Sequence, residues 1–539
     1  MPVIMLDYDD IISLIGQDIP MDELLKRIPM LGASLEGIEG NEISVEFFPN
    51  RPDLFSVEGV ARALRGFLGL EKGLVNYPTE DSGIDFRVDE SVKDVRPYVV
   101  GAVVRNVEMS DYLVRSLMDM QEKLHLTVGR KRRKVSVGVH DLDAVVPPFI
   151  YKALPPEEKS FIPLQGTRKM TMSEILREHP KGIDYAFILE GKDKYPLIVD
   201  KNDDVLSFPP IINGILTAVT EETRNLFIDV TGLDYEAIHT VLVIVATSLA
   251  ERGGKIQTVN LQTQEGAKLT PDLTPKKRVL NRIYANKLIG INLSSVEMID
   301  CLERMRLGCD ASGDDIEVQI PAYRNDILHP ADLVEDVAIA YGYERIEPQL
   351  PREITMGRLI GFNEACNSLR DLMIGYGYTE ASTLSLVGAD SQEEGIGYVR
   401  IKNPITMEQS TIRTSLLPSL MALLRANRHH ELPQRFFEVG DVVIDTKNRR
   451  KLAGVSIHAK AGFTEIKSLV QSILRDLGEE MQIQPRKDGL FIRGRAASVI
   501  KDEKEIGRFG EISPGVIASY ELGYPVVGFE LDLPSLLSD

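Results

Sequence analysis

Hydrophobic and polar positions along this chain follow two periods, one typical of strands and one typical of helices. Residues 43–48 carry an apolar side chain at every second position and predict a strand. Residues 57–68 then place apolar side chains at helical spacing, and Ser56 is a suitable N-cap for that helix. The two prolines of "PNRPD", at 49–53, predict a tight turn between them because proline lacks a backbone donor. Short strands and helices that alternate in this way predict mixed α+β domains.

The middle of the chain is richer in strand patterns. "RPYVVGAVVRNVEM" and "KVSVGVHDLDAVVPPFIYKAL" alternate and are rich in β-branched residues. "NLFIDVTGLDYEAIHTVLVIVATSLAERG" ends in a nearly continuous apolar run, which predicts a buried helix.

The linker-like stretches "TPDLTPKK" and "QLPREITMG" divide the rest of the chain, in which we find no internal repeat. The fold class that we expect is therefore α+β and multidomain. The predicted domains are an N-terminal α+β domain, a strand-rich middle domain, a compact third domain and a last domain of ordinary size, at 1–88, 89–265, 270–351 and 355–539.

The composition and charge of the chain argue against several classes of protein. The chain has 539 residues and a net charge of −19, which argues against a broad nucleic-acid footprint. The densest basic run, residues 130–134, is either a solvated face or a local phosphate contact. The three cysteines lack CxxC spacing, which favours a reduced, cytoplasmic setting over a zinc site. The first ten residues lack a basic signal-peptide region, and the longest apolar run is too short to cross a membrane, so we expect no membrane partner.

Four carboxylates surround a single proline in "RNDILHPADLVEDVAIAYGYERI". Pro330 suits the first turn of a helix, on which Asp332, Glu335 and Asp336 stand at i, i+3 and i+4, with Asp326 just upstream. Acids near a helix N-terminus can simply complement the helix dipole, which explains one or two of them. Four acids also suit a hard divalent cation with oxygen ligands, magnesium first. From spacing alone, both interpretations stay open.

Several stretches, taken together and in order, resemble one family. They are "FFPNRPDLFSVEGVARAL", "GVHDLD", "SFPPIING", "LFIDVTG", "PAYRNDILHPADLVEDVAIAYGY", "NPITMEQSTIRTSLLPSLM" and "FFEVGDVV". The chain resembles the β subunit of phenylalanine–tRNA ligase in its shorter archaeal and eukaryotic cytosolic form. The resemblance implies an (αβ)₂ heterotetramer that joins phenylalanine to its tRNA using ATP, with the synthetic active site in the α subunit.

The resemblance also implies a last domain with the class II synthetase fold, an antiparallel sheet with helices, but without its chemistry. A class II enzyme holds ATP phosphates with an arginine shortly before the glutamate of its second motif and another after the glutamate of its third. Here Phe436 stands two positions before Glu438, with Arg435 displaced by one, and Leu531 follows Glu530. Both phosphate clamps are therefore expected to be lost.

For the four acids the resemblance implies magnesium, with Asp326, Asp332, Glu335 and Asp336 as ligands and the ion shared with the α subunit. For the middle domain it implies an editing site that hydrolyses tyrosine wrongly attached to the phenylalanine tRNA. Its candidate residues are Asp229 for the tyrosine hydroxyl, Ser207 and Asn213 for the ester and water, and Thr231 as a weaker candidate.

Each of these candidates has a structural alternative. Asp229 is also a plausible turn or cap residue, and Ser207 can simply satisfy a loop. His125 and His140 flank the basic run, and packing is the favoured interpretation for each. Two rival functions remain: an assembly or RNA-binding scaffold without editing, and a free-standing magnesium-dependent hydrolase. The second is weakened because no nucleophile or base is evident near the four acids.

Overall fold

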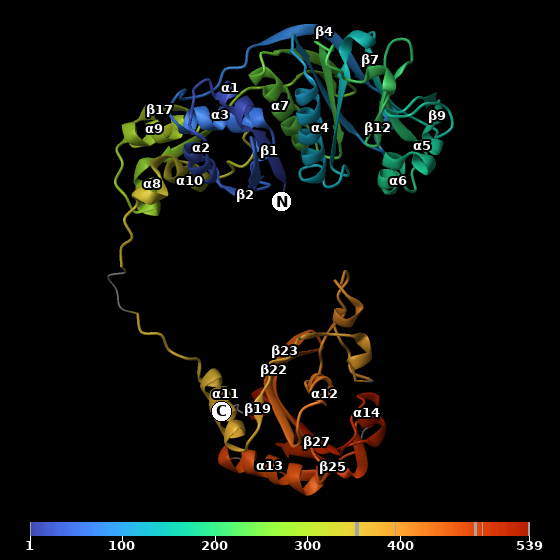
Figure 1. Cartoon of the computed structure of the whole chain (residues 1–539), viewed down its shortest axis with the longest axis vertical. Coiled ribbons are helices and arrows are strands. Elements are labelled where there is room, and N and C mark those ends of the chain that lie inside the picture. Colours follow the sequence, from blue (N-terminus) through green and yellow to red (C-terminus); the bar gives the residue numbers. More distant parts are fainter. Residues whose placement is uncertain (1, 351–354, 394, 479–481, 488, 537–539) are drawn as a thin grey trace. The chain divides into compact units, whose positions relative to one another are not determined.

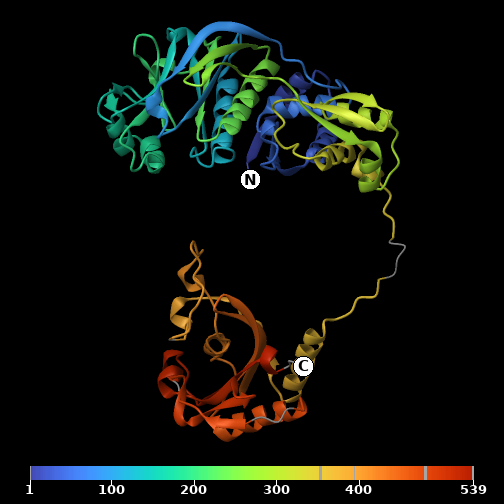
Figure 2. The ribbon, with the colours of Figure 1, turned by 180° about the vertical axis from the view of Figure 1, so that it is seen from behind.

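The computed structural model describes residues 2–350, 355–393, 395–478, 482–487 and 489–536. The chain forms two compact units, Met1–Leu350 and Pro351–Asp539 (Figures 1 and 2). Each unit mixes helices with sheets, so the predicted α+β class is confirmed. Within the described residues no helix is both long and apolar enough to cross a membrane. The three cysteines are free.

The N-terminal segment is a small three-stranded sheet with helices beside it. The strands run in the order β1-β3-β2 and are antiparallel. The elements are β1 (Val3–Asp7), α1 (Tyr8–Ile15), α2 (Met21–Arg27), β2 (Ala33–Glu39), β3 (Glu42–Phe47) and α3 (Val57–Phe67). Ser56 caps α3 as predicted, since its side chain accepts a hydrogen bond from Gly59 N–H. The predicted turn is held by a two-bond ion pair between Arg51 and Asp53.

A ten-stranded mixed sheet forms the middle segment. Its strands run in the order β12-β11-β10-β7-β4-β14-β5-β13-β6, with β15 paired to β14. They are β4 (Thr79–Val88), β5 (Tyr98–Arg105), β6 (Val135–Asp141), β7 (Phe149–Leu154), β10 (Tyr195–Val199), β11 (Val205–Phe208), β12 (Ile212–Asn213), β13 (Leu226–Gly232), β14 (Lys255–Thr263) and β15 (Gly266–Thr270). Because β4 pairs with β7 and β14, it belongs to this sheet and not to the N-terminal domain in which the boundary at 88 placed it.

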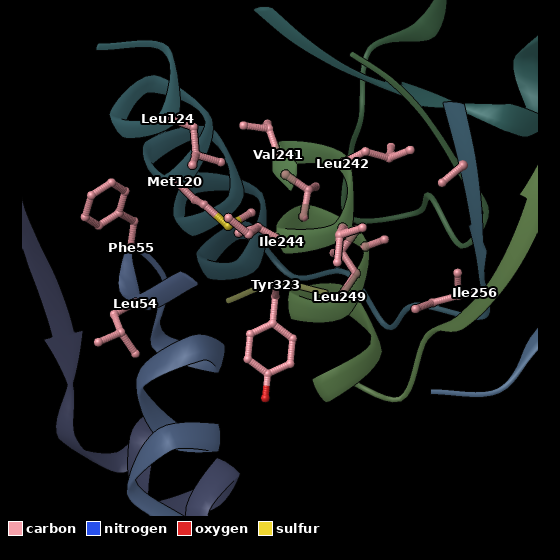
Figure 3. Packing of buried hydrophobic residues seen from close by; sticks show 14 of the residues in the cluster. Leu54, Phe55, Met120, Leu124, Val241, Leu242, Ile244, Leu249, Ile256 and Tyr323 are labelled. Carbon is pink, nitrogen blue, oxygen red and sulfur yellow. The ribbon is translucent and has the colours of Figure 1, made fainter. Parts of the chain in front are cut away.

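Helices cover this sheet. They are α4 (Asp111–Leu126), α5 (Met172–Glu178), α6 (Pro180–Tyr185) and α7 (Tyr235–Glu251), with the short strands β8 (Ser160–Phe161) and β9 (Met170–Thr171) nearby. The apolar run predicted to be buried is α7, which packs on β5, β13 and β6. Figure 3 shows Met120 and Leu124 of α4 beside Val241 and Ile244 of α7 in the hydrophobic core.

The third segment pairs another small sheet with three helices. Its elements are β16 (Lys276–Asn281), α8 (Arg282–Ile289), α9 (Ser295–Arg304), β17 (Gly308–Ser312), β18 (Asp315–Ile320) and α10 (Pro330–Tyr341). Helix α10 starts at Pro330, as predicted, and packs on α9. Helix α9 in turn contacts α3, so the first and third segments share one core.

The second unit is a seven-stranded sheet that carries helices on both faces. The strand order is β19-β22-β23-β27-β26-β25-β24, antiparallel except for the β19–β22 pair. Its strands are β19 (Thr379–Glu380), β22 (Gln434–Ile444), β23 (Lys447–Ile457), β24 (Gln482–Pro485), β25 (Phe491–Lys501), β26 (Lys504–Ile512) and β27 (Val526–Asp532), with β20 (Leu386–Val387) and β21 (Thr411–Ile412) forming a separate pair. Its helices are α11 (Gly361–Gly375), α12 (Leu417–Ala426), α13 (Phe463–Asp476), α14 (Pro514–Ser519) and α15 (Leu533–Leu536). The apolar face of α13 packs in the core, as its spacing predicted.

Candidate active site and the acidic cluster

A cavity of about 160 Å³ opens beside the middle sheet, and the three predicted editing residues all line it. Asp229 comes from β13, Ser207 from β11 and Asn213 from β12. Helices α4 and α6 and the loop of the basic run contribute the remaining charged groups. Residues from strands that are distant in sequence therefore meet at one concave site, as a binding pocket requires.

Asp229 is fixed at the floor of this cavity by its neighbours on β6. It lies opposite Gly138 in the antiparallel register, and His140 stands two residues further along, on the same face. Oδ2 of Asp229 is 2.6 Å from Nε2 of His140, and both side chains are buried. The other imidazole nitrogen, Nδ1, is 2.8 Å from the Thr217 hydroxyl. Oδ1 of Asp229 has no hydrogen-bond partner among the described residues, so it can accept a bond from a ligand.

Gly138 gives the Asp229 carboxylate its room. A Cβ at this position would lie 2.3 Å from Asp229 Oδ2 and 2.8 Å from His140 Nε2. No side chain fits there without moving the pair. The glycine is therefore needed for close approach, not for an unusual backbone angle.

Ser207 and Asn213 face each other across the β11–β12 hairpin, where they are register partners. The Ser207 side chain is 2% exposed, and its hydroxyl has no hydrogen-bond partner among the described residues. Asn213 donates from Nδ2 to the Val139 carbonyl at 3.3 Å and ties the hairpin to β6. A buried hydroxyl that lines a cavity without a partner is poised for a ligand.

Charged groups also line the cavity. Arg132, the middle residue of the basic run, is buried, and its guanidinium bonds to Glu122 of α4 at 2.9 Å and to the Ile211 carbonyl at 2.8 Å. Arg130, Lys131 and Arg133 are exposed, so a solvated face describes only part of the run. His125 accepts a hydrogen bond from Val137 N–H, and burial lowers the pKa of its imidazole to about 4.

The positions of Thr231 and His140 show which of the weaker candidates belong to the site. Thr231 does not line the cavity, because its hydroxyl and carbonyl both accept hydrogen bonds from the buried Arg96 guanidinium. Packing was the favoured interpretation for His140, and it missed the bond to Asp229. The available signal was its position in the alternating strand "SVGVHD", two residues beyond a glycine.

The four acids near α10 differ from one another in their surroundings. Arg324 is buried and donates from Nε and Nη2 to Asp326, at 2.8 and 2.7 Å, and from Nη2 to Asp336 at 2.9 Å. Although burial favours the neutral acid, this guanidinium holds the pKa of Asp326 below its ordinary value. Oδ2 of Asp332 accepts hydrogen bonds from the N–H groups of Leu328 and His329 at the start of α10. Glu335 is exposed.

The described residues therefore contain no group of three His, Cys, Asp or Glu side chains arranged to hold a metal. Two acids already share a cation, the Arg324 guanidinium, and a third caps the helix. This arrangement does not fit a magnesium ion bound by all four acids. The magnesium assignment stays a prediction, and the geometry supplies a different cation for Asp326 and Asp336.

In the second unit, the two glutamates compared with synthetase motifs are buried and paired within the chain. Glu438 Oε1 accepts a hydrogen bond from Arg413 at 2.7 Å. Glu530 accepts bonds from Lys451 Nζ, Arg508 Nη2 and Leu416 N–H at 3.0, 3.1 and 2.7 Å. Although burial alone raises it, these donors lower the pKa of Glu530 to about 2.

Comparisons with known proteins agree along the whole chain. Three family models match it: "Phenylalanyl tRNA synthetase beta chain CLM domain" at residues 346–533, "tRNA synthetase B5 domain" at 279–343 and "B3/4 domain" at 96–269. The phenylalanine–tRNA ligase β subunit of Archaeoglobus fulgidus is 48% identical over 541 residues, which are 99% of this chain and 98% of the relative. The chain belongs to the phenylalanine–tRNA ligase β subunit family.

Further similarities extend this result. The β subunit of Methanococcoides burtonii is 46% identical over 99% of this chain and all of the relative. A solved N-terminal fragment of the phenylalanyl-tRNA synthetase β subunit from Pyrococcus horikoshii is 39% identical and matches with a TM-score of 0.62, covering 64% of this chain and all of the fragment. The predicted family is thus confirmed, and with it the assignment to an aminoacyl-tRNA ligase.

Proposed function

We propose that this β subunit joins an α subunit in an (αβ)₂ assembly that attaches phenylalanine to its tRNA using ATP, and that the cavity at Asp229 hydrolyses tyrosine from mischarged tRNA. The observation that carries the editing role is the meeting of Asp229, Ser207 and Asn213 in one cavity. Family membership supports the α subunit and the tRNA as partners. The synthetic active site belongs to the α subunit.

The Asp229 carboxylate gives this cavity a way to select tyrosine over phenylalanine. Its free Oδ1 accepts a hydrogen bond from the tyrosine hydroxyl. Phenylalanine would leave the same desolvated oxygen without a partner, which is how polar sites reject an analogue that lacks a hydroxyl. A synthetic pocket shaped for phenylalanine rejects an added hydroxyl only weakly, so a second site with this selectivity is needed.

Ser207 and Asn213 are placed to orient the ester and a water molecule. Their register pairing fixes the distance between the two side chains. Among the described residues at this cavity no Ser-His-Asp arrangement is formed, because His140 contacts Asp229 and Thr217 and not Ser207. Hydrolysis would therefore rely on positioning of the attacking water, assisted by the terminal hydroxyl of the tRNA.

Ion pairs in the second unit support the expectation of a class II synthetase-like domain that does not bind ATP. In such enzymes ATP phosphates provide the negative charge that cationic side chains bind. Here Arg413, Lys451 and Arg508 bind the chain's own glutamates, Glu438 and Glu530. Because these cations are already neutralised, the unit is better suited to assembly than to ATP binding.

Co-expression with an α subunit tests the proposal. The assembled complex should charge tRNA with phenylalanine and clear tyrosyl-tRNA. Asp229→Ala should lower clearance by roughly 100-fold or more and leave phenylalanine charging unchanged, since truncating the acceptor removes tyrosine recognition. Asp143→Asn, at an exposed aspartate outside the cavity, is the matched control. A complex that charges tRNA but never clears tyrosyl-tRNA would instead support the scaffold without editing.

A further inference from the structure

The basic run, residues 130–134, forms a loop that reaches the cavity proposed for editing. Arg132 turns inward and lines that cavity, and its side chain is buried. Its neighbours Arg130, Lys131 and Arg133 are exposed. The hydrolysis proposed above gives no role to these three exposed cations.

The backbone holds these cations in a fixed arrangement. Arg130, Lys131 and Arg132 have positive φ angles, of 49°, 55° and 63°, in the left-handed region that residues other than glycine rarely adopt. The loop is closed by a hydrogen bond from Lys134 N–H to the Gly129 carbonyl, at 2.8 Å. Such conformations persist where the surrounding structure determines them, and they cluster at binding sites. Because the loop is preorganised, a ligand that binds it has little ordering cost to overcome.

Aromatic rings lie beside the basic run. The Arg133 guanidinium lies over the ring of Phe187, just after α6, at 4.7 Å from the ring centroid, and Phe187 is 39% exposed. The Arg132 guanidinium lies 4.3 Å from the centroid of Tyr185, whose ring is 6.5 Å from that of Phe187. Lys181 of α6 lines the cavity and lies 5.8 Å from the Tyr185 ring. These contacts form a continuous rim of cations and aromatic rings that leads from the cavity to the surface.

The exposed cations of this rim lack carboxylate partners. Among the described residues, no Asp or Glu side chain lies within ion-pair distance of the three exposed cations of the basic run. In the same part of the chain Lys181 reaches only Glu122, at 3.9 Å, and that carboxylate also accepts from a buried guanidinium. The exposed acid of α6, Asp184, offsets only part of the charge. In a chain of net charge −19 this positive surface is a local exception, and it suits a negatively charged ligand.

Two features of the rim select the chemistry of its ligand. Cations along a groove bind the phosphates of a nucleic-acid backbone, and exposed aromatic rings stack on unpaired bases. Since a duplex hides the faces of its bases, the Phe187 ring suits a single strand. An acidic peptide would use the cations and leave the aromatic ring without a stacking partner. The rim therefore fits single-stranded RNA better than a protein.

We propose that this rim binds the single-stranded 3′ end of the mischarged tRNA and leads its terminal ester into the cavity. Phe187 stacks on a base through the ring face that Arg133 leaves free. Arg130, Lys131 and Lys181 contact phosphates. This proposal rests on the editing function, because the rim borders the cavity that would receive the aminoacyl ester.

RNA binding tests the rim without any hydrolysis. The purified full chain, without the synthetic site of the α subunit, is titrated into a fluorescent single-stranded RNA with the sequence of the tRNA 3′ end. Phe187→Ala should weaken binding roughly tenfold, the effect of losing one stacked base. Phe48→Ala is the matched control, because Phe48 is 48% exposed and does not line the cavity. Equal affinity in Phe187→Ala and the control would overturn the proposal.

Clearance of tyrosyl-tRNA by the complex with the α subunit provides a second measurement. The double variant Arg130→Gln/Lys131→Gln should raise the KM for tyrosyl-tRNA about tenfold with little change in kcat, because it removes binding and not chemistry. The slope of log KM against log salt concentration should fall by about 0.7 for each lost phosphate contact. Lys93→Gln is the matched control, since Lys93 is exposed in the same segment and lines a different cavity.

The two measurements separate this proposal from the editing function. If RNA binding depends on Phe187 and the complex never clears tyrosyl-tRNA, the rim stands and the editing role fails. If the complex clears tyrosyl-tRNA and the double variant keeps the KM and the salt slope of the unmodified complex, editing stands and the rim is overturned. If the chain cannot be purified without the α subunit, the KM and the salt slope decide.

Discussion

Nε2 of His140 lies 2.6 Å from Oδ2 of Asp229, and the imidazole is completely buried. An ionised carboxylate only accepts hydrogen bonds, so Nε2 carries the hydrogen of this bond. The contact uses one oxygen of Asp229 and leaves Oδ1 toward the cavity. In the proposed editing site, His140 would therefore be a positioning residue that fixes which oxygen of Asp229 meets the substrate.

His140→Ala should lower tyrosyl-tRNA clearance by roughly 10–100-fold, because a carboxylate released from its partner no longer holds the productive geometry. Phenylalanine charging by the complex should stay unchanged. A double-mutant comparison separates positioning from general destabilisation. Once Asp229 is alanine, removal of His140 should cost no further clearance, whereas an equal additional loss would show that His140 acts independently of Asp229.

Gly138→Ala should impair the proposed editing without removing any group that contacts the substrate. The added methyl would lie 2.3 Å from Asp229 Oδ2, so the carboxylate or the strand must move. We expect clearance to fall at least tenfold. Gly37→Ala is the matched control, since Gly37 is also in a strand and a Cβ there has no neighbour within 4 Å. Full clearance activity in Gly138→Ala would mean that the position of Asp229 is not critical.

The resemblance to the family pointed to Asp229, Ser207 and Asn213 as candidates for an editing site, and all three line the cavity. The role of His140 was not predictable in this way, since it depends on β6 pairing with β13 in one particular register. That pairing joins residues 89 positions apart, and no local pattern encodes it.

For the acidic cluster, which consists of Asp326, Asp332, Glu335 and Asp336, the spacing along the sequence did not predict the environment of each side chain. Its crowding predicted a divalent cation shared by all four acids; in the structure two of them, Asp326 and Asp336, share the guanidinium of Arg324. Helical spacing nevertheless placed Asp332, Glu335 and Asp336 on one face, whereas the structure gives them three environments: a cap, an exposed surface and a buried ion pair. Whether an arginine side chain turns inward depends on tertiary packing, which spacing along a helix does not report.

Stability of the first unit should fall as the pH is lowered from about 6.5 toward 4. Burial lowers the pKa of His125 to about 4, so in this window the unfolded chain binds a proton that the folded chain does not. The free energy of unfolding should therefore drop by up to about 1.4 kcal/mol per pH unit through this residue. Urea titrations at several pH values measure the slope.

The matched variants for this experiment are His125→Gln and His329→Gln. Glutamine at 125 can still accept the hydrogen bond from Val137 N–H but does not titrate, so the slope should flatten. His329 is exposed, and its replacement should leave the slope unchanged. An unchanged slope in His125→Gln would show that other groups control the pH dependence.

Glu335 and Asp336 offer a way to distinguish the guanidinium from a magnesium ion as the cation of the acidic cluster. Asp336 shares the buried Arg324 with Asp326, so Asp336→Asn should lower the free energy of unfolding by about 1–3 kcal/mol, with or without magnesium, because it removes one bond to a charged group while Asp326 keeps Arg324 paired. Glu335 is exposed, and Glu335→Gln should change stability by less than about 0.5 kcal/mol in magnesium-free buffer.

If the four acids bind magnesium in the complex, the ion should raise the Tm of the complex, and Glu335→Gln should weaken that rise. A magnesium response that is identical in Glu335→Gln and the unmodified complex would exclude Glu335 as a ligand and leave Arg324 as the cation that holds Asp326 and Asp336 together.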